Sequence, residues 1–233
     1  MKAIERRLAI AVEAVCVEIE ERRTQPCIVQ RNEQDVRETL IRCLLSSRVP
    51  YESAIAAARR LRERGLLRRY EDPDWVAAEE QIRCELSRPF GSPGRAWRYR
   101  FPRARAMQVA ASLRSISEAD IMLASLIWER DDVVALRREL VEQLCGIGPK
   151  QGSMFLRDVG RSSELAILDS HVIAYMEIRK LLPTSRAQLS ALGRYEKVEQ
   201  RFRAYAQALG RSIACLDRAV WIVMRVATRE GLV

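Results

Sequence analysis

The chain has 233 residues, of which 48% are hydrophobic, and this is enough apolar material for one large domain or two small lobes, so disorder is not expected. Its formal net charge of +9 indicates a polyanionic partner, because clustered Arg and Lys release counterions when they neutralise phosphates, but charge alone does not distinguish DNA, RNA and an anionic membrane. A single histidine and six cysteines scattered without close pairs argue against a zinc site or an iron–sulfur cluster and indicate reduced thiols.

The first part of the chain is expected to form amphipathic helices. Apolar residues recur at helical spacing over residues 3–23, and a breaker follows at 24–26. Charged residues interrupt this pattern, so it matches neither a signal peptide nor a membrane span, and we expect a cytoplasmic protein that does not enter the membrane. Further helices are predicted over 32–45, from Pro50 to near Gly65, and from Pro73 to Cys84.

An ordered basic loop is predicted over residues 87–105. Three prolines and two glycines in SRPFGSPGRAWRYRFPRAR prevent a continuous helix, and arginines alternate there with aromatic residues. These arginines, Arg100 among them, either contact DNA or lay their aliphatic stems over the core, and we favour the contact with DNA.

The remainder of the chain again has helical periodicity. Helices are predicted over 106–113, 118–129, 133–144, 170–182, 186–209 and 212–227, and no segment shows the alternation of a strand. The expected fold is therefore all-α, a single domain over residues 1–233 made of two helical lobes around a cleft.

A helix-hairpin-helix motif is predicted at about residues 136–160. Leu136, Leu140 and Leu144 share one face of a helix that ends near Gly146, a residue suited to a left-handed helix C-terminus. Pro149 can begin the next helix without losing a hydrogen bond. The turn of Gly146, Ile147 and Gly148 would then offer free backbone N–H groups to a phosphate, although glycine and proline are also ordinary helix punctuation.

Two chemically reactive groups follow this turn. Lys150 lies in the first turn of the second helix, where the positive end of the helix dipole disfavours the ammonium form and so favours a nucleophilic amine; a phosphate contact is the simpler interpretation. Asp169 follows the apolar run 166–168 and has the position of a helix N-cap, which leaves one carboxylate oxygen for chemistry. His171 lies in the same first turn and either donates to a phosphate or packs locally.

Together, LxGIGxK followed by LDSH resembles the helix-hairpin-helix DNA glycosylase superfamily. Within it, GIGPKQGSMFLRDVG and LAILDSH are most similar to the archaeal-type 8-oxoguanine DNA glycosylase/AP lyases, whose corresponding stretches are similar to GIGYKEASHFLRN and AILDRH. LLSSRVPYESAI, YRFPRARAMQVA and CLDRAVWIVMR extend the likeness to about residues 35–230.

This resemblance implies a DNA repair enzyme that acts in base excision repair, a glycosylase with lyase activity in which Lys150 is the nucleophile and Asp169 assists it. It implies no required cofactor, but a structural monovalent cation, K⁺ or Na⁺, on the backbone carbonyls of Glu142, Leu144 and Ile147. The implied partner is double-stranded DNA with a flipped modified base, bound by a monomer.

The resemblance also implies roles for residues distant from the hairpin. Asp217 and Trp221 would lie in the base pocket, and the alternative for Trp221 is a place in the core. Arg48 would fill the gap left by the flipped base, and the alternative for Arg48 is a contact with a phosphate. Gly146, Gly148, His171 and Arg100 would contact the DNA.

Three features depart from the family's pattern. Met154 replaces a histidine, Ser170 replaces a basic residue, and the terminal sequence ATREGLV does not match closely. We expect excision of 8-oxoguanine, with the same chemistry on another modified base, including one from foreign DNA, as the first alternative. A binding module that uses the hairpin only for phosphates is the second.

Overall fold

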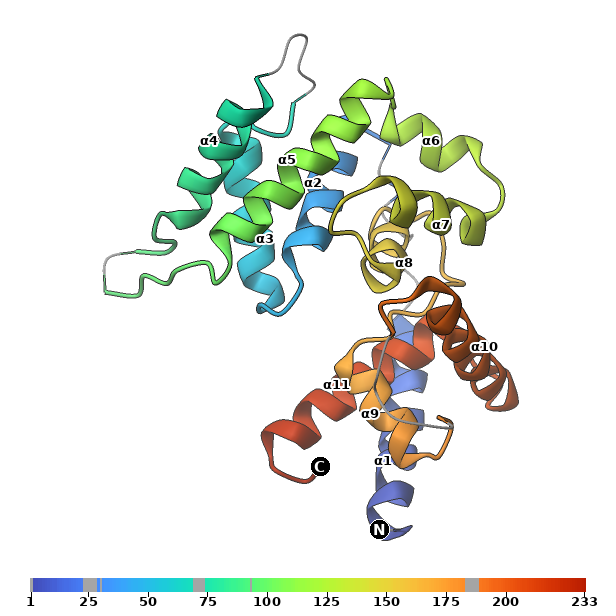
Figure 1. The fold of residues 1–233 in the computed structure, drawn as a ribbon. Helices are drawn as coiled ribbons and strands as arrows, with labels where there is room; N and C mark the ends of the chain where they lie inside the picture. The colour runs from blue at the N-terminus through green and yellow to red at the C-terminus, as the bar shows by residue number, and fades with distance from the viewer. Residues whose placement is uncertain (1, 23–28, 30, 69–73, 93, 183–188) are drawn as a thin grey trace. The chain divides into compact units, whose positions relative to one another are not determined.

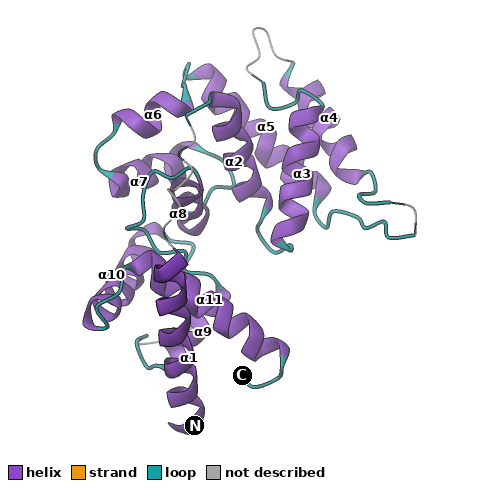
Figure 2. Cartoon of the chain, turned by 180° about the vertical axis from the view of Figure 1, so that it is seen from behind, coloured by secondary structure: helices purple, strands orange, loops and turns teal. Residues whose placement is uncertain are grey.

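The computed structural model describes residues 2–22, 29, 31–68, 74–92, 94–182 and 189–233. Within these residues it consists of helices joined by loops, with one isolated bridge between Phe90 and Trp97 and no strand, which confirms the all-α prediction (Figures 1 and 2). The first six helices are α1 (Lys2–Glu21), α2 (Glu33–Leu45), α3 (Tyr51–Glu63), α4 (Trp75–Ser87), α5 (Pro102–Glu118) and α6 (Leu123–Glu129). The others are α7 (Val133–Gln143), α8 (Pro149–Asp158), α9 (Ser170–Ile178), α10 (Leu192–Ala208) and α11 (Ile213–Arg229).

The helices belong to two compact units. The hairpin unit, Val29–Arg161, holds α2 to α8, and the terminal unit, residues 1–28 and 162–233, holds α1 and α9 to α11. The cleft and the single domain that the sequence suggests stay predictions.

Helix α2 supplies much of the core of the hairpin unit. Its buried residues include Leu40, Ile41 and Leu44, all fully buried, and α2 packs on α3, α5, α6 and α8. The C-terminus of α8 is tied to this core because Asp158 Oδ2 accepts hydrogen bonds from Arg42 Nη2 at 3.0 Å and from the Tyr51 hydroxyl at 2.8 Å. Helix α8 therefore has a defined position within its unit.

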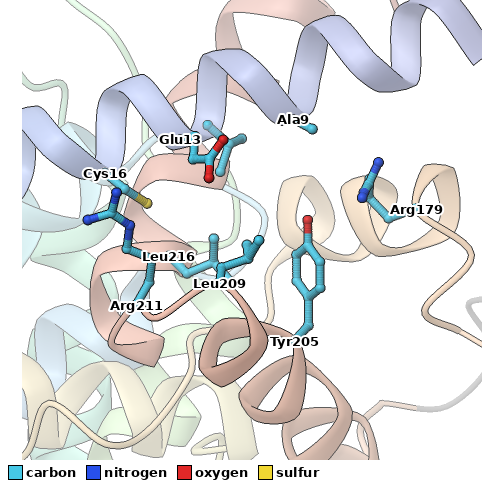
Figure 3. A pocket seen from close by; sticks show the side chains of 9 residues that line it. Ala9, Glu13, Cys16, Arg179, Tyr205, Leu209, Arg211 and Leu216 are labelled. Carbon is cyan, nitrogen blue, oxygen red and sulfur yellow. The ribbon is translucent and has the colours of Figure 1, made fainter.

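The core of the terminal unit forms where α1 and α9 pack on α11 (Figure 1). Its fully buried side chains include Cys16, Tyr175 and Phe202. A cavity of about 210 Å³ lies beside this core, lined on α1 by Ala9, Glu13 and Cys16 and elsewhere by residues that include Arg179, Tyr205 and Arg211 (Figure 3). None of the predicted site residues lines it.

Several predicted helix bounds are wrong. The basic loop ends at Phe101, because Pro102 begins α5, and α5 continues to Glu118. The helix predicted from 118 begins only at Leu123, since Asp120 has a left-handed backbone with φ 52°. The helix predicted to 182 ends at Ile178, before Lys180 with φ 55°.

The other predicted bounds differ less or fall on residues without a description. The N-caps Asn32, Asp74 and Ser212 each accept a backbone N–H with their side chain, so three of the predicted helices begin where a cap permits. Pro73, the breaker at 24–26 and the start of the helix predicted from 186 lie outside the described residues, and α10 begins at Leu192.

Candidate active site

The predicted tight turn between two helices is present at residues 144–148. Gly146 has φ 80°, and Pro149 occupies the first turn of α8 with Gly148 as N-cap, which confirms both predictions. Helix α7 ends at Gln143, earlier than predicted, because Leu144 adopts an extended conformation with φ −108° and ψ 122°. This turn buries the side chains of Leu144 and Ile147, which fixes the loop on its own unit.

Two side chains of α5 contact the turn at residues 144–148. The Ser112 hydroxyl, fully buried, donates to the Cys145 carbonyl at 2.8 Å. The Gln108 side chain lies directly against Gly146, where a Cβ would come within 2.8 Å of its Cδ. Position 146 therefore favours glycine for its backbone conformation, and any other residue there would also have to displace the Gln108 side chain.

Lys150 lies in the first turn of α8 and is half-buried. Among the described residues, its ammonium has no ion pair and no hydrogen bond. Its charge is nevertheless felt inside the unit: burial raises the pKa of the Cys43 thiol well above its ordinary value, and the positive charge of Lys150 opposes that rise. The Lys150 amine is thus close to the buried residues of α2, and no carboxylate of the described residues forms an ion pair with it.

The N-terminus of α8 also has backbone donors available. Gly148 has no side chain to cap the helix, and Pro149 has no N–H, so no capping side chain accepts the backbone N–H groups of Lys150 and Gln151, and a helix N-terminus of this kind can bind an anion. This arrangement can hold a phosphate beside the Lys150 amine.

The carbonyl groups of the turn suit a hard cation. The Leu144 carbonyl accepts one long bond from the Ile147 N–H, at 3.3 Å, and the carbonyls of Glu142 and Ile147 accept none outside the helices of the described chain. Three such oxygens are ligands of the kind that hard cations prefer. No cluster of three His, Cys, Asp or Glu side chains with metal-binding geometry exists in the part of the chain that is described.

Asp169 is the N-cap of α9, as predicted. Its Oδ1 accepts the backbone N–H groups of His171 and Val172, each at 2.9 Å. Its Oδ2 makes no hydrogen bond to any described residue, so one oxygen fixes the carboxylate and the other is available for chemistry. His171, half-buried, lies in the first turn of the same helix.

The segment before Asp169 is held by side chains that sequence reasoning missed. Ala166, Ile167 and Leu168 are not in a helix, and their N–H groups bond in turn to Glu199, Asp217 and Tyr195. The signal available in the sequence was slight: Glu199 is a charged residue on the same helical face as Tyr195 and Phe202, which are both fully buried.

Arg48 lies in the turn between α2 and α3 and has φ 62°, an unusual backbone conformation for arginine. The turn is fixed from the basic loop and α5, because the Tyr99 hydroxyl donates to the Leu45 carbonyl at 2.6 Å and Arg105 Nη2 donates to the Ser47 carbonyl at 3.2 Å. The Arg48 side chain is exposed. A strained backbone that presents a free side chain is typical of functional positions.

The basic loop is ordered in residues 87–92 and 94–101. Phe90 and Trp97 exchange backbone hydrogen bonds at 2.8 and 2.9 Å and stack their rings at 4.4 Å. Phe90 and Tyr99 are buried, so these two aromatic rings face the core and are not available to nucleic acid bases. The arginines of the loop, Arg100 included, are exposed.

The two predicted pocket residues have different environments on α11. Trp221 is 36% exposed, with the Arg225 guanidinium 4.9 Å from its ring, so it is not a core residue. Asp217 is buried, and its Oδ2 accepts the Ile167 N–H at 2.8 Å. Met154, which replaces the family's histidine, is buried in α8.

The chain is similar to known proteins over most of its length. A family model described as 8-oxoguanine DNA glycosylase matches residues 19–211. The 8-oxoguanine DNA glycosylase/AP lyase of Korarchaeum cryptofilum is 25% identical over 206 residues, 88% of each chain. That of Metallosphaera sedula is 32% identical over 133 residues, 53% of this chain and 57% of that protein, so this second match spans little more than half of the relative.

Solved structures show the same architecture. The crystal structure of the 8-oxoguanine DNA glycosylase of Thermotoga maritima is 25% identical and matches with a TM-score of 0.68 over 94% of this chain and 95% of that chain. The Methanocaldococcus jannaschii 8-oxoguanine glycosylase/lyase in complex with a 15mer DNA containing 8-oxoguanine is 20% identical and matches in fold, with a TM-score of 0.63 over 94% and 89%.

Proposed function

The chain belongs to the 8-oxoguanine DNA glycosylase family, and we propose that it excises 8-oxoguanine through the Lys150 amine and the Asp169 carboxylate. Its activity is that of a DNA glycosylase/AP lyase of base excision repair. The observation that carries the residue assignment is the Lys150 ammonium, half-buried at the N-terminus of α8 without an ion pair among the described residues. The proposal requires Lys150 and Asp169, which belong to different units, to reach the same nucleotide.

The proposed reaction begins with nucleophilic attack. The Lys150 amine forms a bond to C1′ of the deoxyribose as the bond from C1′ to the base breaks, and the departing base keeps the bonding electrons and takes up a proton. The free oxygen of Asp169 stabilises the positive charge that develops on the sugar and accepts a proton from the attacking amine. Ring opening leaves an imine between Lys150 and C1′, and loss of a C2′ proton then expels the 3′ phosphate.

The other residues of the proposed site would bind the DNA and the everted base. Everting a nucleotide costs a few kcal/mol of stacking, which contacts to the distorted duplex must offset. The backbone amides of Gly148 and of the first turn of α8 are proposed to bind one phosphate, and Arg100 and His171 are proposed to bind others. Arg48 is proposed to fill the gap that the everted nucleotide leaves in the duplex. The exposed ring of Trp221 supports a role in the base pocket, and Asp217, one helical turn earlier on α11, is the proposed partner of the purine edge.

Further parts of the proposal concern the state of the protein. The three carbonyls at the hairpin are proposed to hold K⁺ or Na⁺, which would neutralise their partial charges and stiffen the turn beside the phosphate site. The active form is proposed to be a cytoplasmic monomer. No described helix combines the length and the apolarity that crossing a membrane requires.

Borohydride trapping tests the proposal. Wild type incubated with a duplex containing 8-oxoguanine should give a covalent protein–DNA adduct, and Lys150→Gln should give none while still binding the duplex. Lys180→Gln is a matched control, because Lys180 is an exposed lysine of the terminal unit outside the proposed site. An adduct of undiminished yield with Lys150→Gln would disprove the assignment of the nucleophile, and its absence with wild type on every damaged or abasic duplex would disprove the lyase mechanism.

A further inference from the structure

Three buried polar side chains surround the chain just before Asp169. Tyr195 and Glu199 come from α10 and Asp217 from α11, and their exposed fractions are 0%, 4% and 3%. We call them the acceptor cluster. Because burying such groups costs free energy unless they are hydrogen-bonded, their presence in the core requires partners, and each has one on the same short segment.

The segment is Ala166, Ile167 and Leu168, three successive residues whose backbone is not paired in a helix or sheet. The Ala166 N–H donates to Glu199 Oε1 at 2.8 Å, the Ile167 N–H to Asp217 Oδ2 at 2.8 Å, and the Leu168 N–H to the Tyr195 hydroxyl at 3.1 Å. The same Tyr195 hydroxyl donates to the Ala166 carbonyl at 2.7 Å. Every N–H of the segment is thus satisfied by a side chain.

These contacts extend to Asp169 itself. The Asp169 N–H donates to the Ile167 carbonyl at 2.8 Å, while its Oδ1 receives two amides of α9. The Asp169 residue is therefore held from one side by the helix that it caps and from the other by the peptide unit of Ile167 and Leu168, whose N–H donates to the Tyr195 hydroxyl. An aspartate side chain has only two rotatable bonds, so fixing the backbone on both sides leaves its free oxygen little range.

We infer that Tyr195 and Glu199 are positioning residues for the glycosylase reaction, which act by fixing the backbone that carries the Asp169 carboxylate. This inference rests on the proposed role of Asp169. It assigns the two α10 residues a function without contact with DNA: they set where the free oxygen of Asp169 lies relative to the everted sugar. Misplacement of a catalytic group by about 1 Å can lower a rate by about 100-fold, so small shifts of this segment matter.

The test compares two tyrosines of α10 that each lose one hydroxyl. Tyr195→Phe removes both bonds to the segment, whereas the control Tyr205→Phe removes the bond between the Tyr205 and Tyr175 hydroxyls at 3.1 Å, which does not involve residues 166–168. Single-turnover release of 8-oxoguanine is measured at saturating enzyme, well below the melting temperature of every variant. We expect Tyr195→Phe to lower this rate between about 10-fold and 100-fold, with affinity for a duplex carrying a tetrahydrofuran abasic analogue unchanged and the control near the wild-type rate.

A double-mutant cycle separates positioning from mere stability. If Tyr195 acts through Asp169, then Tyr195→Phe should change the residual rate of Asp169→Asn much less than it changes the wild-type rate, because the group it positions is already gone. Equal fold-changes in both backgrounds, or a wild-type rate in folded Tyr195→Phe, would overturn the inference. The proposed function would survive that result, since wild-type trapping through Lys150 does not depend on it.

Glu199 provides a second variant should Tyr195→Phe not fold. Glu199→Gln keeps an oxygen at the acceptor position and should keep the rate near that of wild type, whereas Glu199→Met leaves the Ala166 N–H unsatisfied and should lower the rate at least about tenfold. Rescue by glutamine relative to methionine supports positioning by this hydrogen bond. Equal rates for the two folded variants contradict it.

Discussion

The hairpin around Lys150 and the segment around Asp169 hold the two proposed reactive groups in opposite ways. The hairpin fixes its backbone by a glycine turn and by buried apolar side chains, and it leaves a long, flexible amine without a hydrogen bond among the described residues. The Asp169 segment is fixed by side chains from other helices, and its short carboxylate is itself bonded to two amides. The difference corresponds to the proposed chemistry: the nucleophile must follow the sugar carbon through several steps, whereas the carboxylate must remain where the charge develops.

The largest expected effect comes from Asp169→Asn, which keeps the cap and removes the charge. Asparagine caps helices about as well as aspartate, so the fold and the DNA affinity should be retained, while base release falls by about 100-fold to 10,000-fold. Single-turnover excision measures the loss. Asp132→Asn is the matched control, since Asp132 caps α7 through the same two-amide pattern. An undiminished rate in Asp169→Asn would remove the contrast between a mobile and a fixed reactive group.

Gly146→Ala tests whether the hairpin depends on its backbone as argued. A Cβ there meets Gln108 at 2.8 Å in addition to the cost of φ 80°, so we expect a loss of about 2–4 kcal/mol in the free energy of unfolding and weaker DNA binding. Gly210→Ala is the control: φ is 64° but no atom lies within 4 Å, so the loss should be about 1–2 kcal/mol. Chemical denaturation measures both, and equal losses would show that the contact with Gln108 is unimportant.

Arg48→Gly separates backbone strain from function on the hairpin unit. Glycine accepts φ 62°, so the free energy of unfolding should change by less than about 1 kcal/mol, while excision from duplex DNA slows about tenfold because the gap is no longer filled. Lys180→Gly, at φ 55°, is the control and should leave excision unchanged. Loss of affinity for undamaged duplex with an unchanged excision rate at saturation would instead indicate a phosphate contact.

The smallest expected effect concerns Arg100→Ala. If Arg100 contacts one phosphate, the slope of log affinity against log salt should decrease in magnitude by about 0.9, with little effect on excision at saturating enzyme. Arg114→Ala is the control, because Arg114 is paired with Glu118 on α5. Fluorescence anisotropy at several salt concentrations measures the slope. An unchanged slope for Arg100→Ala would place the DNA contact of the basic loop elsewhere.

Much of the fold was predictable because its signals are local. The Asp169 cap, the left-handed Gly146 and the first-turn Pro149 all depend on residues within one or two turns of the chain, and all are present. The helices predicted from residues 32 and 212 begin directly after N-caps at those positions. Two of the errors lie where non-glycine residues adopt positive φ, at Asp120 and Lys180. Both end a helix in a motif closed by local backbone bonds, from Ile121 N–H to the Ile116 carbonyl at 2.9 Å and from Leu181 N–H to the Met176 carbonyl at 2.8 Å, at a position where glycine is the usual sequence signal.

The amino-acid sequence by itself determined the all-helical class, the hairpin and the family, and it led to the proposal of two reactive groups, since periodicity, turn chemistry and motif spacing are properties of neighbouring residues. Only the tertiary structure decided what supports them. The side chains of Ser112, Tyr99 and Tyr195 form hydrogen bonds with Cys145, Leu45 and residues 166–168, which lie 33, 54 and at least 27 residues away along the chain. Hydrogen bonds between such distant positions follow from packing that no local pattern encodes.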